Sequence, residues 1–104
     1  MTRPDPKSLT TLAEVRAGID AIDDDIMTLL AERMAHVEAV LPFKRRDGIP
    51  AAAPDRVQAV YDKTRARAEA NGVDPEMAQA MWKAMVEAII AHEEHELGTT
   101  GDDA

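Results

Sequence analysis

The chain has 104 residues and a formal net charge of −8, so we expect one domain with a core of its own. An acidic chain lacks the basic surface that nucleic acids and anionic membranes require, and we exclude both as partners. Cysteine is absent, which excludes disulfides and thiolate chemistry. Because the start resembles no signal peptide and no apolar run is of membrane-spanning length, we expect a soluble, cytoplasmic protein.

An apolar seam defines the first predicted helix. Thr11 to Glu14 fits a capping box, and apolar residues then recur every three or four positions, which predicts a helix over about residues 11–46. The seam consists of Leu12, Val15, Ile19, Ile22, Ile26 and Leu29. The ring of Pro42 clashes with the carbonyl four residues earlier, so we expect a kink or an early end there.

Two shorter helices follow the loop "DGIPAAA". The second is predicted to begin with Pro54 at its first position and to stop at Asn71, just before a glycine. The third begins after Asp74, a good N-cap, and runs to about Leu97. The pattern therefore predicts an all-α fold with three helices.

The predicted helical domain covers residues 11–97, between an N-terminal extension (1–10) and a disordered tail (98–104). Its first helix, about 35 residues, is about 50 Å long. A compact chain of this size has a radius of gyration of only about 13 Å, so the seam of an isolated chain is left in water. We therefore predict an obligate homodimer in which two long helices pack together.

The seam is interrupted at Arg33, where another apolar residue is due. This arginine either reaches the surface and pairs with an acid such as Glu32 or Asp24, or it faces an anionic ligand. Lys44 lies within about 20° of the same face and about 16 Å further along the helix, so the two cations frame a gap of the size of a small dicarboxylate. Arg16 is about 25 Å before Arg33 and reaches that gap only from an antiparallel partner.

The third helix carries a carboxylate where its apolar face continues. Glu93 follows Ile89 on that face. Either the buried stripe ends early, or Glu93 is held in a mostly apolar pocket that disfavours its charged form. His92 and His95 have no third ligand cluster elsewhere in the sequence, so we expect a charged helix end and no metal site.

These features resemble the all-helical AroQ class of chorismate mutases over nearly the whole chain. The matching segments are "LAEVRAGIDAIDDDIMTLLAERMAHV", Lys44, "IPAAAPDRV" and "ANGVDPE". The most similar branch contains the isochorismate pyruvate-lyases of salicylate and siderophore synthesis. The resemblance implies an intertwined homodimer with two active sites, each completed by an arginine of the other subunit, and no cofactor.

The resemblance also implies a role for each of five residues. Arg16 is supplied across the dimer, and Arg33 clamps a substrate carboxylate within the subunit. Lys44 meets the ether oxygen and a carboxylate. Glu93 is the second donor to that oxygen, at a position where many members have glutamine, and it donates only when protonated. Arg56 matches the family's arginine at the start of the second helix.

Three positions depart from the mutase pattern. Ala53 stands where many mutases have an acid, Val57 where a glutamate grips the ring hydroxyl, and Ile89 where serine is frequent. The expected activity is a chorismate mutase, which rearranges chorismate to prephenate. The alternatives are an isochorismate pyruvate-lyase, giving salicylate and pyruvate, and a non-catalytic helical dimerisation module.

Overall fold

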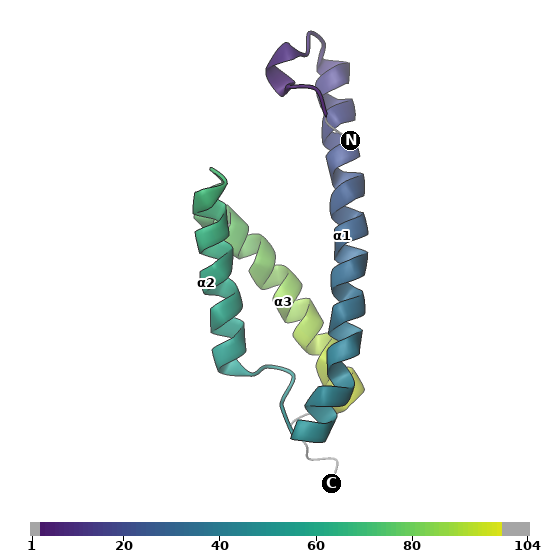
Figure 1. Cartoon of the computed structure of the whole chain (residues 1–104), viewed down its shortest axis with the longest axis vertical. Helices are drawn as coiled ribbons and strands as arrows, with labels where there is room; N and C mark the ends of the chain where they lie inside the picture. Colours follow the sequence, from purple (N-terminus) through teal and green to yellow (C-terminus); the bar gives the residue numbers. More distant parts are fainter. Residues whose placement is uncertain (1–2, 99–104) are drawn as a thin grey trace. The chain divides into compact units, whose positions relative to one another are not determined.

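A computed structural model describes residues 3–98, which form three α-helices, one 3-10 turn and no strand (Figure 1). The elements are η1 (Pro6–Ser8), α1 (Leu12–Asp47), α2 (Pro54–Ala70) and α3 (Pro75–Leu97). The predicted all-α fold class and its three helices are thus confirmed. The tail predicted from residue 98 lies, apart from Gly98, outside the described residues. None of the described helices is long and apolar enough to cross a membrane.

Hydrogen bonds at the start of α1 account for where this helix begins. Thr11 Oγ1 accepts from the Glu14 amide at 3.1 Å and donates to the Glu14 carboxylate at 2.9 Å, which satisfies an otherwise unpaired amide at the helix start. The helix continues through Pro42 to Asp47, so of the two alternatives expected at Pro42, a kink or an early end, the early end is wrong. Leu41, next to the proline, is buried, and its packing stabilises the turn that a proline weakens.

The chain divides into two compact units, residues 1–38 and 39–104, and each is described by itself. In the first unit, Asp5 caps η1, because its side chain accepts from the Lys7 amide at 3.0 Å. Arg3 forms an ion pair with Asp25 on α1. The described part of the N-terminal extension, residues 3–10, is therefore held against the helix that follows it.

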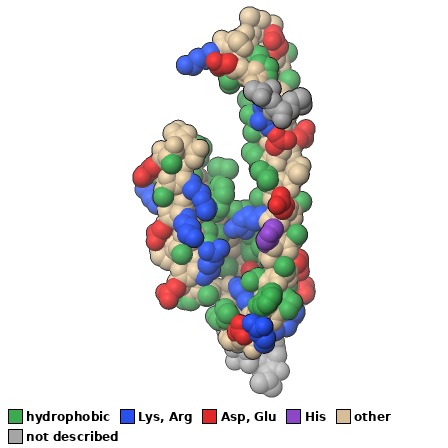
Figure 2. All heavy atoms as spheres, in the orientation of Figure 1, with side chains coloured by type: hydrophobic (Ala, Val, Ile, Leu, Met, Phe, Trp, Pro, Cys, Tyr) green, Lys and Arg blue, Asp and Glu red, His purple; other side chains and the backbone are tan. Residues whose placement is uncertain are grey.

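The predicted seam of the first unit faces solvent. Its members from Leu12 to Leu29 are all exposed, with Ile19 at 52% and Leu29 at 63% of their full accessible surface. A row of exposed aliphatic side chains is unfavourable in water and is typical of a surface that packs against another chain. Apolar side chains are visible along α1 in Figure 2.

In the second unit, α2 and α3 form a helical hairpin. Gly72 adopts a φ of +70° between them, and the Val73 amide donates to the Ala68 carbonyl at 2.8 Å, so the last carbonyls of α2 are satisfied. Asp74 then caps α3 by accepting from the Glu76 amide at 3.0 Å. These bonds set the direction in which α3 leaves the turn.

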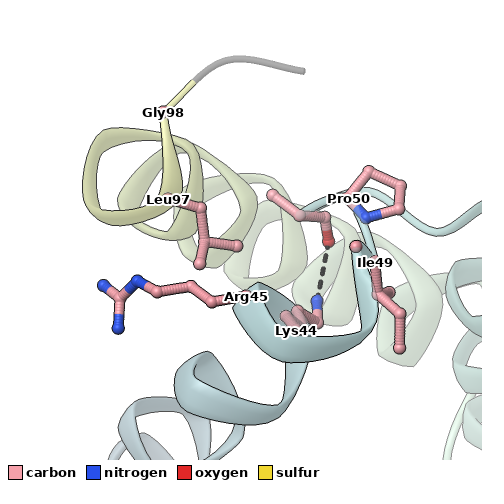
Figure 3. Close-up of a pocket in the computed structure, with 8 residues that line it drawn as sticks. Lys44, Arg45, Ile49, Pro50, Leu97 and Gly98 are labelled. Atoms are coloured by element: carbon pink, nitrogen blue, oxygen red, sulfur yellow. Dashed lines mark hydrogen bonds between the residues drawn. The ribbon is translucent and has the colours of Figure 1, made fainter. Parts of the chain in front are cut away.

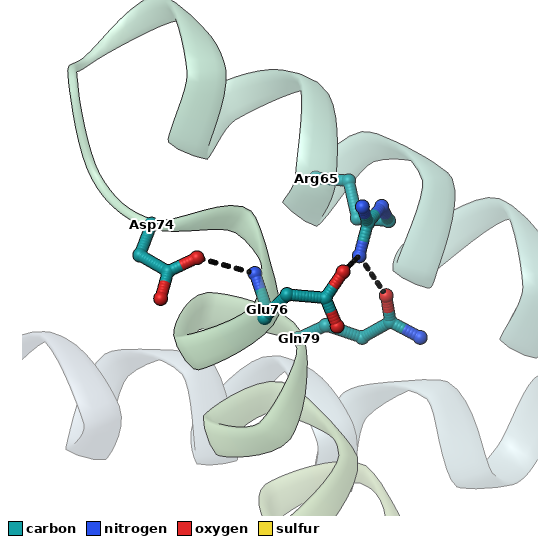
Figure 4. Close-up of polar contacts among 4 residues, drawn as sticks. All are labelled: Arg65, Asp74, Glu76 and Gln79. Carbon is teal, nitrogen blue, oxygen red and sulfur yellow. Dashed lines mark hydrogen bonds and ion pairs between the residues drawn. The ribbon is translucent and has the colours of Figure 1, made fainter.

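The two helices of the hairpin are held together by small and aliphatic side chains. The buried residues are Thr64, Ala68, Ala78, Val86 and Ile89. On the surface, Arg65 donates to Gln79 at 2.7 Å and to Glu76 at 3.2 Å, which links α2 to the first turns of α3 (Figure 4). This packing fixes the buried face of α3, on which Glu93 lies.

Candidate active site

Lys44 and Glu93 meet inside the second unit although 49 residues separate them. Lys44 Nζ donates to Glu93 Oε1 at 2.6 Å and to the Ala51 carbonyl at 3.0 Å. Their side chains retain only 13% and 7% of their accessible surface. The structure therefore brings together two of the five predicted site residues, one from the last turns of α1 and one from α3.

The loop after α1 positions the ammonium group. Gly48 adopts a φ of +64°, and the Ile49 amide donates back to the Lys44 carbonyl at 2.9 Å, which closes the helix end. The chain then turns so that the Ala51 carbonyl accepts from Lys44 Nζ (Figure 3). This acceptor was missed at the sequence level because a backbone carbonyl carries no residue-type signal.

Glu93 lies on the apolar face of α3 that also buries Val86 and Ile89. Of the two readings left open for Glu93, early termination of the buried stripe is wrong, since the residue is only 5% exposed. A buried carboxylate is stable only when it is paired and hydrogen-bonded, and Lys44 provides that partner.

The pair combines a hydrogen-bond donor, the Lys44 ammonium, which can also bind an anion, with an acceptor, the Glu93 carboxylate. An ammonium group has three N–H bonds, and two of those on Lys44 are directed at protein acceptors, which leaves one for another oxygen. Within residues 3–98, no group of three His, Cys, Asp or Glu side chains is arranged to hold a metal ion. Next to the pair, the hydrogen bond from Arg46 lowers the pKa of the exposed Asp47 carboxyl.

A hollow of about 460 Å³ opens beside the pair (Figure 3). It is lined by Lys44, Arg45, Gly48, Ile49, Pro50, Ala51, Leu97 and Gly98. Arg45, one of these lining residues, donates to the Glu96 carbonyl at 3.2 Å. Of the five predicted site residues, only Lys44 lines this hollow. The hollow therefore does not bring the predicted arginines close to Lys44.

The three predicted arginines carry no partner among the described residues. Arg16 and Arg56 are exposed and Arg33 is half-buried, and none of the three side chains forms a hydrogen bond or an ion pair with the part of the chain that is described. The alternative pairing of Arg33 with Glu32 or Asp24 is therefore not formed. The grouping of these arginines around Lys44 stays a prediction.

Comparison with known proteins assigns the family. Residues 15–94 match the family described as chorismate mutase type II. The chain is 36% identical to an isochorismate pyruvate lyase of Pseudomonas aeruginosa over 85% of this chain and 86% of that protein. It is 34% identical to a chorismate mutase of Methanocaldococcus jannaschii over 73% and 77% of the two chains. A T-protein of Enterobacter agglomerans is 35% identical over 65% of this chain and 18% of its own length. The chain belongs to the type II chorismate mutase family.

Proposed function

We propose that the chain is a chorismate mutase that rearranges chorismate to prephenate. The observation that carries this proposal is the buried Lys44–Glu93 pair, because in a member of this family its oriented Lys44 ammonium is a donor of the kind that the reaction needs. The methanogen relative named chorismate mutase, which covers nearly three quarters of this chain, supports the same activity.

The proposed reaction assigns the protein two tasks. In the rearrangement a C–O bond of the ether breaks and a C–C bond forms within one molecule, and no proton passes to or from the protein. The protein must hold a flexible dianion in its compact reactive shape, which charged hydrogen bonds to both carboxylates achieve. It must also stabilise the negative charge that grows on the ether oxygen.

Lys44 is suited to the second task. Its ammonium is fixed by Glu93 and by the Ala51 carbonyl, so its remaining N–H has a defined direction before any substrate arrives. A donor that is oriented in advance and shielded from water stabilises developing charge without reorganising during the reaction. We assign the two carboxylates of the dianion to Arg33 and Arg56 of the same subunit and Arg16 of a second one.

Glu93 acts in this proposal as the second donor to the ether oxygen. A carboxyl group donates a hydrogen bond only when protonated, and an ionised carboxylate repels the developing charge. Lys44 and Glu93 can both donate to one substrate oxygen only after Glu93 has taken up a proton. The catalysed step in this proposal therefore uses the protonated form of Glu93.

The proposed active form is a homodimer. The exposed seam of α1, from Leu12 to Leu29, supplies a continuous apolar surface for a second copy. A two-fold interface gives each copy the same contacts, so one arrangement supplies Arg16 to both sites. A homodimer of this kind gives a role to Arg16, whose side chain is unpaired within the described residues and which lies about 25 Å before Arg33 on the same helix.

Isochorismate pyruvate-lyase activity is the second candidate. The observation in its favour is the 36% identity to the Pseudomonas relative over most of both chains. In this reaction a ring hydrogen moves to the methylene carbon of the enolpyruvyl group as the same C–O bond breaks, which releases pyruvate and needs no protein base. Val57, which has no group to grip the ring hydroxyl of chorismate, is compatible with this substrate.

Incubation of the purified chain with each substrate separates these activities. Loss of chorismate is followed by absorbance and formation of salicylate from isochorismate by fluorescence, with prephenate identified by chromatography. Prephenate from chorismate at a higher kcat/KM supports the main proposal, and salicylate from isochorismate at a higher kcat/KM supports the second. Turnover of neither substrate contradicts both and leaves the non-catalytic dimerisation module.

A further inference from the structure

A basic stripe runs along α2. Arg56, Lys63 and Arg67 are separated by seven and four residues, which places them within about 20° of one line on the helix surface. All three are exposed, and none of their side chains has a hydrogen bond or ion pair with the residues that the structure describes. Figure 2 shows Lys and Arg side chains gathered on the visible face of α2.

An acidic face lies on the first part of α1. Asp20 and Asp23 lie within about 40° of Arg16 on the helix surface and continue its face toward the C-terminus. Both carboxylates are exposed and have no partner within residues 3–98. This distinguishes them from Asp25, which points to the other side of the helix and pairs with Arg3.

The acidic face borders the exposed apolar seam. Ile19 and Ile26 lie about 60–80° round the helix from Arg16, so a second copy that covers the seam brings Asp20 and Asp23 to the edge of the same interface. Acids at the edge of an interface favour a partner surface that presents basic groups there. The basic stripe of α2 supplies these groups.

We propose that Asp20 and Asp23 of one copy pair with Lys63 and Arg67 of a second copy. The spacings agree: the two acids are about 4.5 Å apart along α1 and the two bases about 6 Å apart along α2, well within the reach of Lys and Arg side chains. The proposal rests on the homodimer described above and specifies which charged surfaces meet in it.

This pairing positions Arg16. Because Arg16 precedes Asp20 by about 6 Å on the same face, fixing the acids against α2 fixes how far the arginine extends into the other copy. Charged groups at the edge of an interface set register and partner choice more than they add affinity. Lys63 and Arg67 are thus positioning residues, and they act on the substrate only through the partner's Arg16.

Charge reversal tests the proposal directly. The variants Asp20→Lys/Asp23→Lys and Lys63→Glu/Arg67→Glu each place like charges opposite one another, twice per dimer. We expect the dimer dissociation constant from sedimentation to rise at least about thirty-fold in each, since several weak pairs become repulsive. Combining all four substitutions in one chain restores the attraction with its polarity inverted, and dimerisation recovers.

Two matched controls separate the pairing from general charge effects. Glu32→Lys changes an exposed acid of α1 on the face opposite Arg16, and Lys83→Glu changes an exposed base of α3. Both are expected to leave the dissociation constant within about two-fold of the unmodified chain. Circular dichroism of each variant verifies that the helices are retained.

The outcomes distinguish this proposal from the proposed activity. The pairing is supported if both double variants dimerise weakly and the fourfold variant dimerises like the unmodified chain. This result does not depend on whether the chain converts chorismate. Unchanged dissociation constants, or no recovery in the fourfold variant, overturn the pairing even when the unmodified chain is an active dimer. A monomeric unmodified chain overturns both the pairing and the homodimer.

Discussion

Replacing Lys44 by alanine is expected to reduce both catalysis and stability, for separable reasons. Catalysis loses a preorganised donor to the ether oxygen. Deleting one donor of this kind lowers kcat by a factor of about 100 or more. We therefore expect kcat for chorismate to fall by at least that factor.

The stability effect follows from the burial of Glu93. Its side chain is 7% exposed, and the substitution removes the cation that donates to it at 2.6 Å. Removing one partner of a buried ion pair costs about 3–5 kcal/mol. Protonation of the abandoned carboxyl relieves part of this cost, so we expect the free energy of unfolding to fall by about 2–3 kcal/mol.

Making Lys44→Ala in the Glu93→Gln variant separates its effect on catalysis from its effect on stability. In the Glu93→Gln background the neighbour of Lys44 is neutral, and Lys44→Ala then costs only about 1 kcal/mol, as for an ordinary hydrogen bond. Its effect on kcat remains large in both backgrounds. Unfolding is measured by urea titration at one fixed protein concentration, because the stability of a dimer depends on concentration.

Arg45→Ala is the matched control on the adjacent residue. Arg45 is exposed, and its side chain donates to the Glu96 carbonyl. We therefore expect Arg45→Ala to lower the free energy of unfolding by less than about 0.5 kcal/mol and to change kcat little. Retention of kcat in a folded Lys44→Ala variant would refute the role of Lys44. If Lys44→Ala lowers the free energy of unfolding equally in the unmodified chain and in the Glu93→Gln variant, the loss of stability does not come from the buried charge of Glu93.

Three further predictions follow from the same structure. Glu93→Gln should leave kcat for chorismate close to that of the unmodified chain, because an amide group can donate to the ether oxygen as a protonated carboxyl does, and a fall in kcat as large as that of Lys44→Ala contradicts the donor role of Glu93. Gly72→Ala should lower the free energy of unfolding by about 1 kcal/mol, since φ is +70° there. Gly18→Ala, in the interior of α1, should raise it by up to about 1 kcal/mol. Thermal denaturation in which both variants change the stability in the same direction contradicts this. Ile22→Lys should yield monomers by sedimentation, and a persistent dimer means that the seam is not the interface.

The helices could be predicted from the sequence because their signals are local. Capping residues, prolines at the first position and the turn around Gly72 act within a few residues, and each predicted helix begins and ends within about two residues of the observed one. The exception is Pro42, where a helix end was allowed for and the helix continues. Packing of the neighbouring Leu41 depends on residues far along the chain, which a local pattern does not contain.

The candidate site could be predicted only in part. Glu93 can be identified because it breaks the apolar face of the third helix, and Lys44 because it lies on the same face of the first helix as Arg33. Their ion pair cannot be predicted, since nothing in the sequence fixes the distance between α1 and α3. The Ala51 carbonyl was missed because its role depends on the backbone path of the loop. The places of Arg16, Arg33 and Arg56 around Lys44 depend on contacts between copies and stay predictions.

Complementation between two inactive variants tests most directly whether one site is built from two copies. Arg16→Ala and Lys44→Ala are purified separately, mixed in equal amounts and allowed to exchange subunits. Each mixed dimer then holds one site with both residues and one site with neither, so the mixture should recover about a quarter of the unmodified activity with chorismate. Activity of the mixture no greater than that of the two variants measured apart would contradict the account.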